Sequence, residues 1–236
     1  MSSIKDEKGY NQGFELVEST RIRMMRRAGF FLEVMDKRPE QKALEIGCGT
    51  GEVSFWIAQR VPMQILGTDI SELFISNAQE KFKRDNLKYE VLDFNHPGEL
   101  VRGSYDYVFG NGILHHLYYT LDESLVKMKE LLKPGGKMVF MEPNIYNPYC
   151  QLIFKVPFLR KKANLEPDEM AFSAGFIRKK LEQAGYTNIK VTYKDFLLPG
   201  IPAFLVKPSI AIGNIAERLP LIKKVAQSIF IEAQSI

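Results

Sequence analysis

The sequence predicts an α/β fold in which a mostly parallel sheet is flanked by helices. Short apolar runs alternate with amphipathic segments up to about residue 145, an order that is typical of βαβ units. A glycine-rich turn, 47–51, follows the first apolar run. Acidic residues stand at or near the ends of the first three runs, at Glu45, Asp69 and Asp93.

The expected elements can be placed one after another. Ser71 is a suitable N-cap for the helix behind it, and Thr120 with Glu123 matches a capping box. A glycine at 185 is expected to end the last predicted helix of this series. Strands are expected at 43–46, 63–69, 88–93, 105–110, 137–143 and 187–196, and helices at 52–61, 72–86, 121–132 and 177–186.

The glycine turn carries most of the functional information. Such a loop lets a ligand approach the backbone closely and presents amide donors at a helix N-terminus. The third glycine of a dinucleotide-binding fingerprint would be residue 52, which is Glu52. The Gly-Lys-Ser/Thr triplet of a phosphate-binding loop is absent here. The spacing therefore disfavours a nicotinamide oxidoreductase.

The pattern Glu-x-Gly-x-Gly-x-Gly at 45–51 resembles motif I of the class I S-adenosylmethionine (SAM) methyltransferases. The segment around Asn111 and the Leu-Lys-Pro-Gly-Gly sequence at 132–136 resemble later parts of the same family, in the same order. The resemblance covers roughly residues 40–145 and is closest to the UbiE-like type, which acts on small molecules and lipids. It implies a Rossmann-like, mostly parallel seven-stranded sheet with one antiparallel strand near the edge. It also implies SAM as cofactor and S-adenosylhomocysteine as product.

The resemblance implies a set of cofactor-binding residues. The glycine loop would pass under the methionine and ribose parts of SAM, and Asp69 would accept hydrogen bonds from the ribose hydroxyls. Asp93 would accept a hydrogen bond from the adenine amino group, and Phe94 would pack on the adenine ring. Asn111 would lie near the methionine group of SAM. The complete set is Glu45, Gly47, Cys48, Gly49, Gly51, Asp69, Ile70, Asp93, Phe94 and Asn111.

Catalysis requires an acceptor aligned with the activated methyl group and, for a hydroxyl or an amine, a base. His115 and His116 follow the fourth strand, where an acceptor should lie; each is a candidate base, and packing is the alternative for each. His115 aligns with a histidine of phosphobase N-methyltransferases. In those enzymes a tyrosine from the N-terminal segment forms a dyad with this histidine. Tyr10 is the implied partner, unless it closes over the SAM carboxylate. Glu142 is a second candidate base, whereas a carbon or sulfur acceptor needs no strong base.

Composition and net charge limit which other classes of protein the chain can belong to. With 236 residues, 45% of them hydrophobic, the chain can bury one substantial core. Two cysteines give no disulfide framework and no metal spacing, so we expect no metal and a reducing, cytoplasmic location. A net charge of +4 is short of a nucleic-acid signature, and no Asn-Pro-Pro-Tyr/Phe tetrad follows the fourth strand. We see no signal peptide and no apolar run long enough to span a membrane.

Five segments are expected: an N-terminal helical cover (1–38), a SAM-binding core (39–145), an acceptor-site insertion (146–172), the completion of the sheet (173–200) and apolar C-terminal helices (201–236). The arginines at 21, 23, 26 and 27 are interpreted as the solvated face of the covering helix. Apolar and basic residues without an acid at 148–162 could touch a membrane surface.

The sequence thus predicts a SAM-dependent methyltransferase with a small-molecule or lipid-like acceptor and leaves the acceptor atom, O, N or C, unresolved. The alternative is a protein of the same fold that acts on a protein partner or has no catalytic activity. Peripheral membrane contact and a homodimer both stay open, and nucleic acid is not an expected partner.

Overall fold

The computed structural model describes residues 18–95, 100, 102–162, 165, 170–198 and 200–236. Its sheet has seven strands in the order β3-β2-β1-β4-β5-β7-β6. All neighbours are parallel except β7, which runs antiparallel to both β5 and β6, and this confirms the predicted fold class. The strands are β1 (Lys42–Ile46), β2 (Gln64–Asp69), β3 (Leu87–Val91), β4 (Tyr105–Asn111), β5 (Leu132–Pro143), β6 (Thr187–Lys194) and β7 (Ser228–Gln234).

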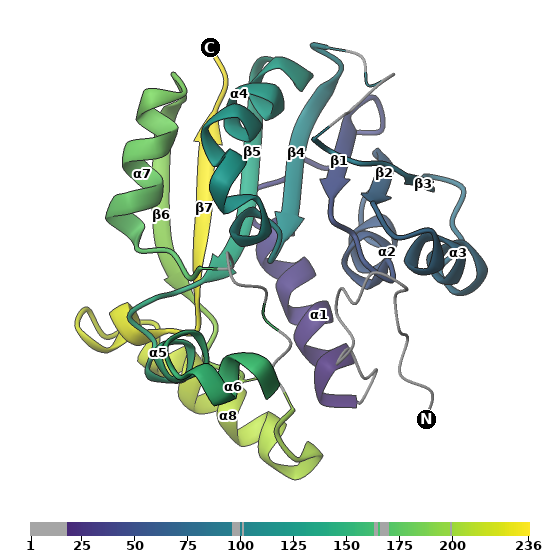
Figure 1. The fold of residues 1–236 in the computed structure, drawn as a ribbon. Coiled ribbons are helices and arrows are strands. Elements are labelled where there is room, and N and C mark those ends of the chain that lie inside the picture. The colour runs from purple at the N-terminus through teal and green to yellow at the C-terminus, as the bar shows by residue number, and fades with distance from the viewer. Residues whose placement is uncertain (1–17, 96–99, 101, 163–164, 166–169, 199) are drawn as a thin grey trace.

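Helices cover both faces of the sheet (Figure 1). Residues of α1, α2 and α3 share one buried apolar cluster with one face of the strands, and residues of α4 and α7 share a second cluster with the other face. The helices are α1 (Glu18–Leu32), α2 (Glu52–Ala58), α3 (Glu72–Lys81), α4 (Leu121–Leu131), α5 (Pro148–Lys155), α6 (Pro157–Lys162), α7 (Ala174–Gln183) and α8 (Ala203–Ala216), with 3-10 turns at η1 (Leu114–Thr120) and η2 (Ile222–Val225).

The carboxyl ends of the parallel strands meet at one edge of the sheet. The loops that carry the candidate site residues follow β1, β2, β4 and β5 and therefore converge there, as expected for an open α/β sheet. In Figure 1, α1, α5, α6 and α8 lie below this edge. The described residues contain no helix that is long and apolar enough to cross a membrane.

The C-terminal segment corrects one prediction. Residues 201–236 were expected to be helical, and α8 and η2 are, but 228–234 form β7 between β5 and β6. Ser228–Ile231 are buried, and both edges of the strand are hydrogen-bonded to neighbours. A short apolar run fits a buried strand and a buried helix equally well, so its periodicity alone could not decide between them.

The two predicted N-caps have different outcomes. Ser71 caps α3, since its hydroxyl accepts a hydrogen bond from the Phe74 amide at 3.3 Å. The capping box at Thr120 is wrong, because the Thr120 side chain makes no capping hydrogen bond to α4. The chain enters α4 directly from the 3-10 turn η1 rather than from an extended segment, so the N-cap geometry does not arise.

Candidate active site

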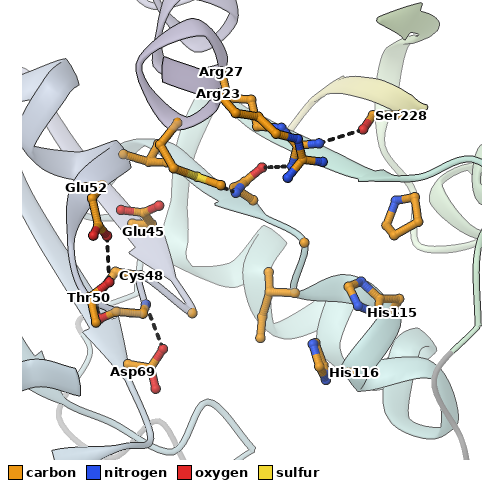
Figure 2. A pocket seen from close by; sticks show the side chains of 18 of the residues that line it. Arg23, Arg27, Glu45, Cys48, Thr50, Glu52, Asp69, His115, His116 and Ser228 are labelled. Carbon is orange, nitrogen blue, oxygen red and sulfur yellow. Dashed lines mark hydrogen bonds between the residues drawn. The ribbon is translucent and has the colours of Figure 1, made fainter. Parts of the chain in front are cut away.

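A cavity of about 470 Å³ lies at the carboxyl ends of β1, β2 and β4. Its floor is the loop after β1, and its walls come from α1, η1, α5 and the start of β7 (Figure 2). This volume is in the range of small-molecule sites. Among the predicted cofactor-binding residues, Glu45, Gly47, Cys48, Gly49, Asp69 and Asn111 line it.

The glycine loop needs its glycines for two different reasons. Gly47, Gly49 and Gly51 all have positive φ, at 67°, 53° and 87°. A Cβ on Gly47 would lie 2.7 Å from the Ile113 side chain, and one on Gly51 would lie 2.7 Å from the Tyr89 hydroxyl. A Cβ on Gly49 would meet nothing within 4 Å. Gly47 and Gly51 are therefore packed against the protein, whereas Gly49 leaves its backbone accessible to a ligand.

Asp69 is fixed at the edge of this loop. One carboxylate oxygen accepts a hydrogen bond from the Gly49 amide at 2.8 Å (Figure 2). The other accepts one from the Ser71 amide at 3.0 Å. The carboxylate thus has a defined position at the tip of β2, beside the accessible backbone. This arrangement fits a sugar hydroxyl pair held between loop and strand.

Glu45 lies under the loop and is 1% exposed. It accepts a hydrogen bond from the Ser54 hydroxyl. Burial raises the pKa of Glu45 to about 8, and the nearby Glu52 adds to the shift. The Glu45 carboxyl therefore holds a proton at neutral pH.

The predicted adenine end of the site lies outside this cavity. Ile70, Asp93 and Phe94 are not among the described residues that line it. Phe94 is buried in the apolar cluster under α4, and Asp93 accepts a hydrogen bond from the Asn95 amide at 2.9 Å. Their assignment to adenine stays a prediction.

His115 and Glu142 form a buried pair. Nδ1 of His115 lies 2.7 Å from Oε2 of Glu142. Glu142 also accepts hydrogen bonds from the amides of Ile113 at 2.9 Å, Leu114 at 2.8 Å and His115 at 3.4 Å. In the tautomer of His115 that carries its hydrogen on Nδ1, the imidazole donates to Glu142 and Nε2 is the acceptor nitrogen of the ring.

Two of the candidate bases predicted from the sequence, His115 and Glu142, thus form one hydrogen-bonded unit. His115 lines the cavity, and Glu142, which is not among its lining residues, stands behind it. The ring of His116 lies 4.2 Å from that of His115, between centroids, and also lines the cavity. Tyr10, the partner implied by the resemblance to phosphobase enzymes, lies outside the described residues.

The arginines of α1 correct another prediction. Arg23 and Arg27 are 9% and 5% exposed and line the cavity, so they are not on a solvated face. Both lie on the helix face that buries Met24, Ala28 and Phe31. A spacing of four residues beside that apolar stripe was the signal in the sequence that could have placed them inside.

A third wall of the cavity is largely apolar. Tyr149, Ile153 and Phe154 of α5 line it together with Leu165. The segment predicted to form an acceptor-site insertion therefore does face the same cavity as the glycine loop. An apolar wall opposite polar groups is the usual composition of a small-molecule site.

Comparison with known proteins finds a methyltransferase domain in the chain. Residues 44–138 match the family model of a methyltransferase domain. The chain is 29% identical over 175 residues to the highly reducing polyketide synthase lcsB of Purpureocillium lilacinum, over 68% of this chain and 7% of that protein. It is 35% identical over 119 residues to the hybrid synthetase poxE of Penicillium oxalicum, over 47% of this chain and 3% of that one. The chain thus spans less than a tenth of the length of these relatives.

Solved structures share the fold. The CurJ carbon methyltransferase superposes with a TM-score of 0.63 at 22% identity, over 98% of this chain and 58% of that one. A SAM-dependent methyltransferase from Archaeoglobus fulgidus gives 0.65 at 18% identity, over 91% and 94%. Phosphoethanolamine N-methyltransferase 2 of Haemonchus contortus, in complex with SAM, gives 0.61 at 18% identity, over 92% and 52%.

Fold, glycine loop and family model agree. The chain contains a methyltransferase domain and has the fold of the class I SAM-dependent methyltransferases, and SAM is its cofactor, as the sequence predicted. The predicted roles of individual residues remain proposals.

Proposed function

We propose that the chain transfers a methyl group from SAM to a carbon atom that lies next to a carbonyl group in a small acyl-type acceptor. The observation that carries this proposal is the His115–Glu142 pair, which faces the cavity beside the glycine loop. The names of the similar proteins support it, since they include polyketide synthases and a carbon methyltransferase.

The residues that line the cavity fit the cofactor. In the proposed complex the accessible backbone at Gly49 takes the methionine arm, Asp69 binds the ribose and Asn111 borders the reacting end. SAM, when bound, supplies an electrophilic methyl group; this group bonds to the acceptor carbon while its bond to sulfur breaks, and S-adenosylhomocysteine is left.

The protein's part is the removal of a proton. Nε2 of His115 takes the hydrogen of the acceptor carbon, and the electron pair of that C–H bond passes to the neighbouring carbonyl as an enolate. Glu142 keeps the other ring nitrogen protonated and stabilises the imidazolium that forms. A carbon flanked by two carbonyl groups is acidic enough for imidazole, whereas an isolated methylene is not. The pair therefore favours a β-dicarbonyl acceptor.

Methyl transfer to a simple β-keto thioester tests the proposal. We expect the protein, incubated with SAM and the N-acetylcysteamine thioester of acetoacetate, to give a product one methyl group heavier, with that group on the α-carbon by NMR. The α,α-dimethyl thioester is the matched control, because it has no α-hydrogen and should not react. Methylation of hydroxyl or amine acceptors in a substrate panel, with none on the thioester, would contradict the proposal.

The same proposal includes contact of α8 with an anionic membrane surface. Phe204, Ile212 and Ile215 follow helical spacing on α8 and are 77%, 68% and 63% exposed. The basic residues Lys207, Arg218, Lys223 and Lys224 accompany them, and the acid Glu217 in this stretch is bound to Arg26. An exposed apolar stripe with one sign of charge suits an anionic lipid surface.

Vesicle binding tests this part separately. We expect the protein to sediment with vesicles that contain phosphatidylserine but not with purely zwitterionic ones, and we expect Ile212→Glu to abolish binding. Lack of sedimentation together with a concentration-dependent dimer that Ile212→Glu dissociates would instead make the stripe a contact between copies of this chain.

A further inference from the structure

Arg23 and Arg27 reach into the cavity opposite the proposed base. Figure 2 shows the two guanidinium groups on one side of the cavity and the imidazoles of His115 and His116 on the other. Both arginines come from α1, whose sequence gave no functional motif. Their position, burial and charge raise the question of what they bind.

The protein holds each guanidinium mainly from one side. Nε of Arg23 donates to the Leu197 carbonyl at 3.2 Å, and Nη2 donates to Oε1 of Gln227 at 2.6 Å. Nη1 of Arg23 has no hydrogen-bond partner among the described residues. Because Arg23 lines the cavity and no nitrogen of it is a buried orphan, the unused N–H groups are accessible from the cavity.

Arg27 is held more completely. Nη1 donates to Asn111 at 2.7 Å, Nη2 donates to Gln227 at 2.7 Å and to the Ser228 hydroxyl at 3.0 Å, and Nε contacts Asp195 at 3.4 Å. The Gln227 side-chain oxygen therefore accepts from both arginines. A neutral amide oxygen joins the two cations without neutralising either one.

The charge around the pair is not balanced by its ion-pair partners. The buried carboxylate of Asp195 is shared by Arg23 at 4.0 Å, Arg26 at 3.5 Å and Arg27 at 3.4 Å, and Arg26 also contacts Glu217 at 3.1 Å. Three guanidinium groups thus share two carboxylates. Glu142 also acts electrostatically on Arg27, but its hydrogen bonds go to His115 and three amides and to neither arginine.

Burial makes the positive charges of the two arginines unfavourable. It lowers the pKa of Arg23 to about 9, with the neighbouring Arg27 as the next cause, and it lowers the pKa of Arg27 as well. With a pKa of about 9, Arg23 remains a cation at neutral pH. An anion placed against the unused donors would relieve the repulsion and would form charge-assisted hydrogen bonds in a site of low dielectric constant.

We infer that Arg23, positioned by Arg27, Gln227 and Asp195, binds an acceptor oxygen that carries or develops negative charge. This inference rests on the proposed function, in which removal of a proton by His115 places negative charge on the carbonyl oxygen of the acceptor. Of the two arginines, Arg23 is the one with unused hydrogen-bond donors. Tyr149, on the apolar wall of the cavity formed by α5, interacts with it electrostatically. Donors preorganised where charge develops stabilise the transition state.

The site also excludes one class of acceptor. A cavity wall that carries two guanidinium groups repels ammonium groups beside it. Amine acceptors that are cationic before methylation are therefore disfavoured, and acceptors with a carbonyl or carboxylate oxygen beside the reactive carbon are favoured.

The test compares Arg23→Gln with Arg21→Gln, a matched control at an exposed position of the same helix. The probes are acetoacetate and its neutral analogue acetoacetamide, titrated by calorimetry into protein loaded with S-adenosylhomocysteine. We expect the wild type to prefer acetoacetate. The Arg23→Gln variant should lose roughly tenfold or more in acetoacetate affinity, since a hydrogen bond to a charged group is removed. Arg23→Lys should recover part of the loss, and Arg21→Gln should change nothing.

Two further readouts separate the explanations. The affinity for SAM should be unchanged in Arg23→Gln, and deuterium exchange at the α-carbon of the acetoacetyl thioester should slow by roughly tenfold. Loss of SAM affinity would overturn the inference, because Arg23 would then serve the cofactor carboxylate. Unchanged acetoacetate affinity with a lower melting temperature would reduce Arg23 to a structural role.

Failure of the proposed function is distinguishable from failure of the anion site. If the wild type neither methylates nor exchanges the thioester, carbon methylation is wrong. The preference for acetoacetate over acetoacetamide, and its loss in Arg23→Gln, still decides whether the site binds an anionic oxygen.

Discussion

The proton on Glu45 gives the sharpest quantitative prediction. In the unfolded chain this glutamate titrates at its ordinary pKa of 4.5, whereas burial under the glycine loop raises the folded value to about 8. Between these values the folded protein retains a proton that the unfolded chain releases. Raising the pH from 4.5 to 8 therefore destabilises the fold, and the effect is absent below 4.5.

Glu45→Gln should remove this pH dependence. The amide has the shape of the protonated carboxyl group, and its oxygen can still accept the Ser54 hydrogen bond. Between pH 4.5 and pH 7 the linkage amounts to about 3 kcal/mol, at about 1.4 kcal/mol per pH unit. We expect the variant to be more stable than the wild type by up to this amount at pH 7 and equally stable at pH 4.5.

Urea unfolding of the ligand-free protein between pH 4.5 and pH 8 measures the difference. Glu80→Gln is the control, since Glu80 is exposed on α3 and should give no pH-dependent difference. A stability difference between Glu45→Gln and the wild type that is zero throughout, or that does not change with pH, would refute the buried-proton explanation.

The remaining predictions concern the cofactor and the base. Asp69→Ala should weaken SAM binding by roughly tenfold or more while the far-UV spectrum is unchanged, because two ribose hydrogen bonds are lost; unchanged affinity by calorimetry would remove the ribose assignment. His115→Ala should reduce methyl transfer by about a hundredfold or more with little change in SAM affinity, and wild-type turnover would leave the histidine a packing role. Glu142→Gln should slow turnover by roughly ten- to a hundredfold through loss of the tautomer and orientation of His115, which turnover and the pH profile together would measure. Gly47→Ala should abolish SAM binding and lower the melting temperature, because φ is 67° and Ile113 lies 2.7 Å from the new Cβ; a wild-type melting temperature would contradict the packing explanation.

The sequence alone determined the fold class and the cofactor family. Both depend on local patterns, namely apolar runs that alternate with amphipathic segments and a glycine turn of fixed spacing at 47–51. The positive φ values at this turn confirm a constraint that is local to a few residues. Ser71 is a similar case, since a cap depends on the residues within one turn of it.

Only the tertiary structure decided the contacts between distant segments. Residues 228–234 form a strand because they pair with β5 on one side and with β6 on the other. The local sequence pattern does not indicate these pairings. His115 and Glu142 are 27 residues apart and meet because β4 and β5 end side by side. Arg23 and Arg27 are buried because α1 packs across the carboxyl edge of the sheet, where Asp195 and Gln227 contact both guanidinium groups. Such partners lie far apart in the chain, so their pairing is set by packing and electrostatics of the whole fold.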